Sequence, residues 1–79
     1  MNTYKLSNIS IAQFREFLFE IGCTRISIEG GHEKWHKNGC LRPIIIQTHI
    51  DPIPEFIIKN NLRSLGLTRK DFIDWMKRR

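Results

Sequence analysis

Hydrophobic residues recur at intervals of three and four near the start of the chain, a spacing that gives a helix one apolar face. They are Ile11, Phe14, Phe17, Leu18 and Ile21. Ser10 followed three residues later by Gln13 is a capping-box pattern. Gly22 stands where a left-handed C-terminal cap is expected. The pattern predicts a helix over residues 11–21.

The middle of the chain changes to the period of two that is typical of strands. Residues 24–29 alternate polar and β-branched side chains, which predicts a strand with one buried face. Gly30-Gly31 ends this strand, and residues 32–37 follow as a short polar strand that carries Trp35.

A third strand is predicted over residues 40–47, which are rich in isoleucine. Asn38-Gly39 precedes it and favours a type I′ hairpin turn, because that turn needs positive φ at both central positions. Pro43 lacks an N–H for the ladder, so we expect it at a strand edge or a bulge. Three strands joined by short turns form an antiparallel meander.

Two helices are predicted after the loop of residues 48–54. In the first, Ile58, Leu62 and Leu65 form the apolar stripe, and Gly66 follows as the cap. Thr68 with Asp71 three residues later predicts the start of the second. The order α-β-β-β-α-α predicts an α+β two-layer sandwich, a three-stranded antiparallel sheet with helices on one face. Residues 1–79 are too few for more than a single domain.

Composition narrows the class of protein. The 79 residues carry a net charge of +5 and 41% hydrophobic residues, an ordinary globular composition without an apolar run long enough to span a membrane. Met1–Lys5 lack the apolar region of a signal peptide, and Cys23 and Cys40 are too few for a disulfide scaffold. We therefore expect a cytoplasmic protein with reduced thiols and no membrane partner. The positive charge favours an anionic partner such as nucleic acid, or simply keeps the surface soluble.

The candidate chemistry lies on the second predicted strand. Alternation places His32, Lys34 and His36 on one face and Glu33, Trp35 and Lys37 on the other, so helices on the Trp35 side would leave the histidine face open. Gly30-Gly31 lets a bound strand approach the backbone closely. RNA carries its own nucleophile in the 2′-OH, so one histidine to move protons and nearby cations to hold the phosphate can suffice for cleavage.

Less specific interpretations stand beside this one. A lone surface histidine on a strand is usually a tolerated polar residue. Trp35 could stack on a base, but an aromatic beside an isoleucine-rich strand is more often core. A zinc site would combine His32, His36, Cys40 and His49. Positions four apart on a strand lie roughly 13 Å from each other, so the first two histidines cannot share one ion.

Several motifs together resemble the HicA toxin family of bacterial toxin–antitoxin systems. They are Ile21-Gly22-Cys23, Gly30-Gly31-His32-Glu33-Lys34-Trp35, Pro43, His49 and the run from Asn61 to Thr68. The resemblance covers the chain from about Ile11 to Phe72. It differs at Gly31, where the family commonly has serine, and at Gln47, where a proline is usual.

The resemblance implies a double-stranded-RNA-binding-domain-like fold and a translation-independent mRNA interferase, with the family's catalytic histidine at His32. It also implies a HicB-like antitoxin partner, which we expect to cover His32. We expect a metal-independent endoribonuclease that acts on mRNA and needs no cofactor. The predicted RNA contacts are Gly30, Gly31, Lys34, Lys37, Arg42 and His49. The alternative is a non-catalytic RNA-binding module of the double-stranded-RNA-binding type.

Overall fold

Helix α1 (Ile11–Glu20) begins at the predicted cap. The fold is that of a computed structural model, which describes residues 6–78; Met1–Lys5, on which the signal-peptide expectation rests, and Arg79 lie outside the described residues. The Ser10 hydroxyl accepts a hydrogen bond from the Gln13 N–H at 3.0 Å. Ile21 is the C-terminal cap, so the helix ends one residue before the predicted boundary.

The sheet contains three antiparallel strands in the order β1-β2-β3, as the sequence predicts. They are β1 (Thr24–Glu29), β2 (His32–His36) and β3 (Ile44–Gln47). In the register of β2 with β3, His32 lies opposite Gln47 and Trp35 lies opposite Ile44. β2 is the central strand, so its position in the sheet is fixed from both sides.

The two turns of the meander differ in backbone conformation from what the sequence predicts. Gly30 and Gly31 both have positive φ, 54° and 81°, which is the signature expected for the other turn. At Asn38-Gly39 only Gly39 has positive φ, and the Cys40 N–H donates to the Lys37 carbonyl at 3.0 Å. The predicted type I′ turn at Asn38-Gly39 is therefore wrong; positive φ at the second position alone is typical of a type II turn.

The return strand is shorter than predicted. β3 begins at Ile44, and residues 40–43 form an irregular segment between the turn and the strand. Pro43 immediately precedes the first strand residue, and its missing N–H explains why the ladder does not extend further back. β2 likewise ends at His36, so Lys37 belongs to the turn and strand alternation does not place its side chain.

The expectation that β1 has one buried face is also wrong. Ile26 and Ile28 are 56% and 52% exposed. β1 is an edge strand that packs mainly on β2, whereas α2 (Glu55–Ser64) packs against β3. A shift in register between Arg25 and Ser27 further interrupts the alternation of β1.

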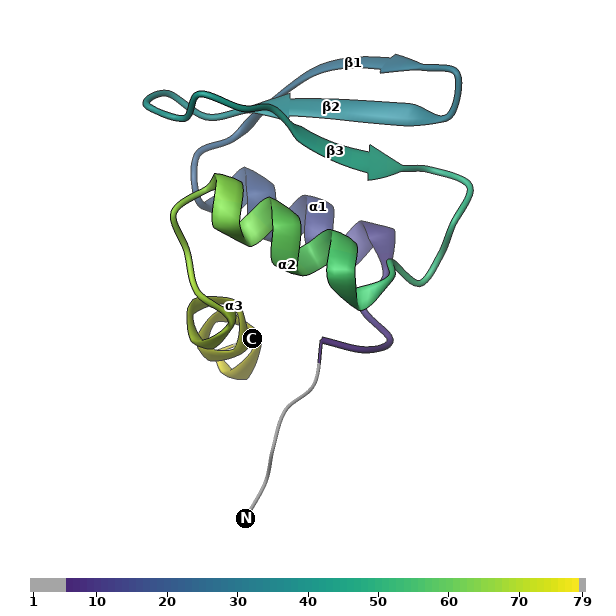
Figure 1. Cartoon of the computed structure of the whole chain (residues 1–79). Helices are drawn as coiled ribbons and strands as arrows, with labels where there is room; N and C mark the ends of the chain where they lie inside the picture. Colours follow the sequence, from purple (N-terminus) through teal and green to yellow (C-terminus); the bar gives the residue numbers. More distant parts are fainter. Residues whose placement is uncertain (1–5, 79) are drawn as a thin grey trace.

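The helices lie on one face of the sheet, as predicted (Figure 1). α1 and α2 lie beneath it, and α3 (Arg69–Lys77) lies on their far side. An aromatic cluster of Phe14, Phe17, Phe72 and Trp75 joins α1 to α3. Thr68 and Asp71 form the predicted capping box at the start of α3. This arrangement leaves the opposite face of the sheet uncovered.

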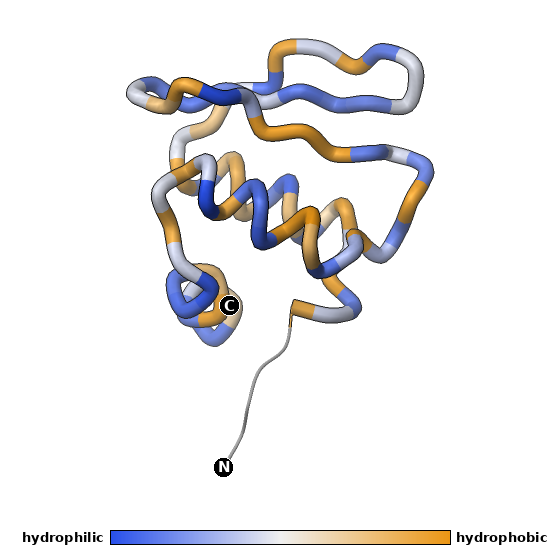
Figure 2. The backbone as a smooth tube through the Cα atoms, viewed as in Figure 1, coloured by the Kyte–Doolittle hydropathy of each residue, from blue (hydrophilic) through white to orange (hydrophobic). Residues whose placement is uncertain are grey.

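Hydrophobic residues concentrate between the sheet and the helices. Figure 2 shows β3 as hydrophobic and β2 as largely hydrophilic. Trp35 is the aromatic exception on β2 and is only 6% exposed, so it belongs to the core, as expected. Cys23 is also buried, and burial raises the pKa of its thiol. Among residues 6–78, no helix is long and apolar enough to cross a membrane.

α2 completes the sheet at its β3 edge through Asn61, which is buried. Its side-chain amide donates to the Ile45 carbonyl at 3.0 Å and accepts from the Ile45 N–H at 3.4 Å. These are backbone groups that no further strand pairs, since β3 lies at the edge of the sheet.

Candidate functional site

The outer face of β2 presents three basic side chains. His32, Lys34 and His36 are exposed, while Glu33 and Trp35 between them are buried. The helices lie on the other side of the sheet, so nothing in the described chain covers this face (Figure 1). The alternation predicted from the sequence is confirmed, and it places the His32 imidazole in contact with solvent.

The segment after β3 folds back onto the turn between β1 and β2. The Thr48 N–H donates to the Gly31 carbonyl at 2.8 Å, and the Thr48 hydroxyl donates to the same oxygen at 3.1 Å. A Cβ added to Gly31 would lie 3.2 Å from His49 Nδ1. The structure therefore brings Gly31, His32 and His49 to one corner of the sheet, and the absence of a side chain at Gly31 makes room for the second imidazole.

The loop that carries His49 is also held at its other end. Asp51 Oδ1 accepts a hydrogen bond from the Ile11 N–H at the start of α1, at 3.2 Å. Two residues later, the Ile53 N–H donates to the Ile9 carbonyl at 2.8 Å. His49 thus sits between two anchored points, one on the glycine turn and one on the N-terminus of α1.

A buried ion pair supports β2 from beneath. The Glu33 side chain is fully buried, and its carboxylate accepts hydrogen bonds from Arg15 Nε at 3.0 Å and Arg15 Nη2 at 2.6 Å. Trp35 Nε1 donates to Glu33 Oε1 at 2.6 Å. Burial disfavours the charged form of Glu33, but the hydrogen bonds from both partners and the Arg15 charge outweigh burial and lower the pKa of the carboxyl.

Sequence reasoning missed this pair. Alternation does place Glu33 on the helix side of the strand, and a carboxylate in that position needs a cationic partner. Arg15 is 18 residues away on α1, and only the packing of the helix against the sheet shows that it supplies the charge. The pair holds the residue that follows His32 on the helix side of the sheet, and alternation then puts His32 on the open side.

The remaining predicted contacts do not gather at this corner. Lys34 lies in the middle of the exposed face of β2, opposite Ile45. Lys37 lies in the turn beyond the strand, and Arg42 lies in the irregular segment before β3. Since strands rise about 3.3 Å per residue, His32 and His36 are separated by about 13 Å along β2. The predicted set therefore divides into one group around His32 and another at the opposite end of the sheet.

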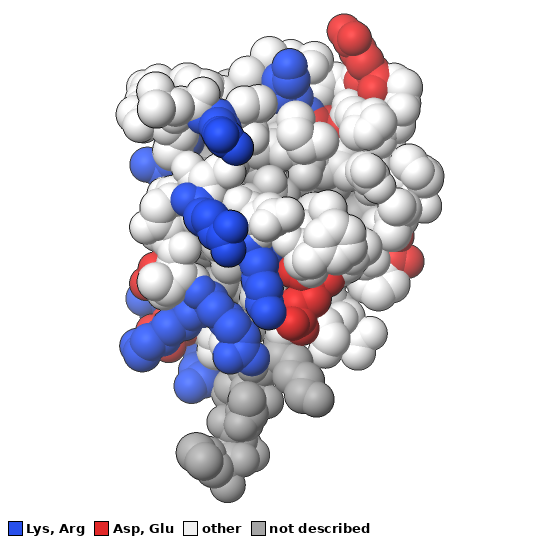
Figure 3. All heavy atoms as spheres, in the orientation of Figure 1, with Lys and Arg blue, Asp and Glu red and all other residues white. Residues whose placement is uncertain are grey.

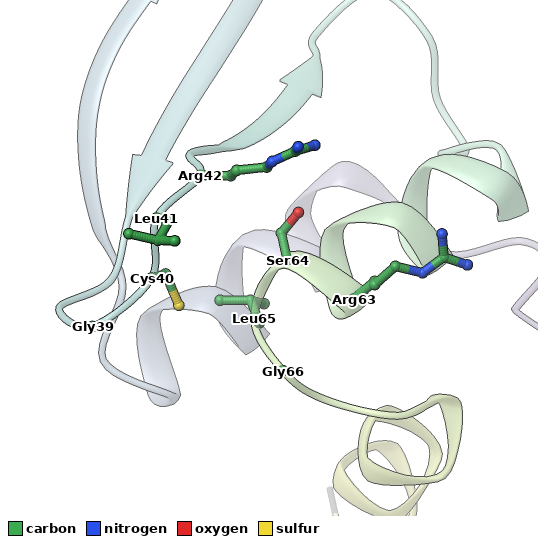
Figure 4. Close-up of a pocket in the computed structure, with 8 residues that line it drawn as sticks. All are labelled: Gly39, Cys40, Leu41, Arg42, Arg63, Ser64, Leu65 and Gly66. Atoms are coloured by element: carbon green, nitrogen blue, oxygen red, sulfur yellow. The ribbon is translucent and has the colours of Figure 1, made fainter.

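Arg42 instead contributes to a groove of about 370 Å³ between the β2–β3 connection and the end of α2. The groove also contains Arg63 and Ser64 from α2 (Figure 4). Sequence reasoning did not single out Arg63, because its separation of 21 positions from Arg42 carries no local signal. The residues that line the groove include no carboxylate.

No group of three or more metal-ligating side chains comes together within residues 6–78. The chemistry available at the corner is that of imidazole beside a cationic surface: proton transfer by His32 or His49, and attraction of an anion by Lys34.

Comparison with protein-family models, with curated proteins and with solved structures finds no match to this chain. The resemblance to HicA toxins therefore stays a prediction that rests on the motif residues themselves.

Proposed function

We propose that the protein is a metal-independent endoribonuclease that cleaves mRNA, and that it acts as the toxin of a toxin–antitoxin pair. The observation that carries the proposal is the position of His32 on the uncovered face of the sheet, next to Lys34 and at the same corner as His49. The resemblance to the HicA family supplies the biological setting.

The proposed reaction is transesterification within the RNA. His32 takes the proton of a 2′-OH, the 2′ oxygen attacks the adjacent phosphorus, and the bond from phosphorus to the 5′ oxygen breaks. The leaving 5′ oxygen takes up a proton from water, so the products are a 2′,3′-cyclic phosphate and a 5′-hydroxyl. In the reverse assignment, His32 acts as the acid that protonates this leaving oxygen. Lys34 stabilises the extra negative charge of the transition state.

Gly30, Gly31 and His49 would then contact the RNA around the scissile phosphate. The two-glycine turn has no side chains to obstruct the backbone of a bound strand. His49 lies against Gly31, the residue before His32, and would offer a second imidazole to the same RNA.

A HicB-like antitoxin would silence the site by covering His32. β1, the edge strand next to β2, exposes Ile26 and Ile28, which would give a protein partner an apolar contact at the edge of the sheet. A cytoplasmic location follows from the proposed mRNA substrate.

The test compares the wild type with His32→Ala and His36→Ala, incubated with a long single-stranded RNA in EDTA. His36 is the matched control because it is the same residue type, equally on the exposed face of β2, but about 13 Å from the corner. We expect His32→Ala to lower cleavage by about 100-fold or more, since general acid–base groups typically contribute at least that much. His36→Ala should stay near the wild-type rate.

The chemical form of the ends gives an independent check. Cleavage products of the wild type should carry 2′,3′-cyclic phosphates, and a 3′-hydroxyl product would rule out the mechanism. Equal loss in both histidine variants would show that the corner is not the catalytic centre.

The second candidate is an RNA-binding module that performs no chemistry, favoured by the carboxylate-free groove at Arg42 and Arg63. It predicts that the wild type binds the same RNA without cleaving it, and that His32→Ala leaves the affinity within about tenfold, or 1.4 kcal/mol.

A further inference from the structure

Several cationic side chains lie close together on the face of the protein that Figure 3 shows. Figure 3 shows Lys and Arg as a band that runs from the sheet, across the end of α2, towards α3. Within this band lie two adjoining hollows of about 370 and 390 Å³, which share Arg63 and Gly66. The first contains Arg42, and the second contains Lys59 and Arg69. Neither is lined by an acidic residue.

We propose that the groove between Arg42 and Arg63 binds the phosphate backbone of RNA at a second place, separate from the His32 corner. This inference rests on the proposed function and adds to it how the substrate is held. The occupant is a single RNA strand that extends along the molecule from the catalytic corner.

Both arginines are available for a ligand. Arg42 and Arg63 are exposed, and neither forms an ion pair with any carboxylate of residues 6–78. Figure 4 shows the two side chains extending to the same side of the groove, with the Ser64 hydroxyl directed towards Arg42. The planar guanidinium fork suits a phosphate, which it can bind through two parallel hydrogen bonds.

The end of a helix is an unfavourable place for an anion unless its carbonyls are satisfied. At the end of α2, the Leu67 N–H donates to the Leu62 carbonyl at 2.9 Å, and the Gly66 N–H donates to the Arg63 carbonyl at 3.0 Å. This is the Schellman pattern, with Gly66 at φ 73°. The Leu62 and Arg63 carbonyls are thus occupied, and the charged side chains that line the groove are the two arginines.

The position of the groove explains why Arg42 lies so far from His32. The groove begins at Gly39, beyond the far end of β2, so more than about 13 Å separates it from the corner. A phosphate bound there does not belong to the scissile bond. The groove would therefore hold a long RNA in register and contribute to affinity without taking part in bond cleavage.

The test measures binding of a labelled 2′-O-methyl RNA oligonucleotide, which lacks the nucleophilic 2′-OH and cannot be cleaved. The variant is Arg42→Gln/Arg63→Gln. The control is Arg25→Gln/Arg78→Gln, which removes the same two charges from exposed positions on β1 and at the end of α3, outside the groove. Melting curves of each variant establish that it is folded.

Each phosphate contact to a single strand contributes about 0.7 to the slope of log affinity against log salt. Loss of two contacts should therefore reduce the slope of the groove variant by about 1.4. The ratio of wild-type affinity to variant affinity should be about sevenfold larger at 50 mM salt than at 200 mM. The salt concentrations differ fourfold, and 4 raised to the power 1.4 is about 7. The control should change the slope by clearly less, and Arg42→Lys/Arg63→Lys, which keeps both charges, should retain most of it.

Equal slopes for the groove variant and the control would overturn the proposal, because the effect would then be net charge alone. A labelled poly-glutamate peptide tests the alternative that the groove binds an acidic segment of a protein. If the groove variant loses the peptide but binds RNA as the wild type does, the groove is a protein-docking site and the RNA assignment is wrong.

Failure of this inference is distinguishable from failure of the proposed function. If the groove variant has wild-type binding while the wild type still cleaves natural RNA through His32, only the groove assignment falls. If the groove binds RNA but no cleavage occurs, the groove stands and the endoribonuclease proposal falls.

Discussion

Removing Arg15 should destabilise the protein more than removing any other exposed arginine. In Arg15→Met the Glu33 carboxylate stays fully buried and keeps one hydrogen bond, from Trp35. Breaking a buried ion pair at one partner typically costs 3–5 kcal/mol. The Arg15 side chain is 38% exposed, so solvent screens part of the interaction, and we expect about 2–3 kcal/mol.

A double-mutant cycle isolates the pair. Glu33→Gln should cost about 2 kcal/mol, because a charged hydrogen bond is lost and Arg15 can turn to solvent. The double variant Arg15→Met/Glu33→Gln should cost about as much as the worse single change, which gives a coupling energy of about 2 kcal/mol. Urea unfolding followed by the fluorescence of Trp35 and Trp75 measures all four proteins, with Arg63→Met as the exposed-arginine control.

Acid should reduce the difference in stability between the wild type and Arg15→Met. The pKa of Glu33 in the folded protein lies below its ordinary value of 4.5, so the stabilisation is complete above that value and is lost as pH falls through the folded pKa. In Arg15→Met, burial without a cation reverses the sign, because the unpaired carboxyl gains from protonation. The stability gap should therefore begin to narrow above pH 4.5, where the unpaired carboxyl of the variant takes up its proton, and should narrow further as pH falls through the lowered pKa of the wild type. Additive single effects within about 0.5 kcal/mol, or a gap that does not change with pH, would refute this account.

Two further predictions concern the edges of the site. Asn61→Leu should cost about 1–3 kcal/mol in urea unfolding, because the Ile45 N–H and carbonyl lose their partner in the interior; an unchanged midpoint would show that water replaces the amide. Gly31→Ala should lower RNA cleavage more than Gly30→Ala: both glycines have positive φ, but only a Cβ at Gly31 meets the His49 ring, at 3.2 Å. Equal activity in the two alanine variants would show that the position of His49 does not matter.

Much of the fold follows from local patterns in the sequence. The Ser10 cap, the period of two on β2 and the Thr68 capping box each depend on residues within a few positions of one another. Steric and hydrogen-bonding preferences of neighbouring residues determine such features, so the order and types of the elements could be predicted. The exposure of His32 was predicted for the same reason, since alternation along one strand fixes which side chains share a face.

The errors arose where a local pattern depends on its surroundings. The isoleucines of β1 have the alternation of a half-buried strand, yet they are exposed because the helices pack beneath β2 and β3 rather than beneath β1. Asn38-Gly39 has the composition of a type I′ turn, but Pro43 shortens the strand that such a turn would have joined directly. In the first case the packing of other elements outweighed the preference of the segment, and in the second a proline outside the turn did so.

The sequence by itself determined the elements, the basic charge and the strand face that carries His32. Only the tertiary structure brought His49 against Gly31, placed Arg15 beneath Glu33 and set Arg42 beside Arg63. These pairs are 18 to 21 positions apart and join different elements. Contacts of that kind form only when the sheet and helices pack together, because burial of the shared apolar core, not any local preference, fixes which side chains meet.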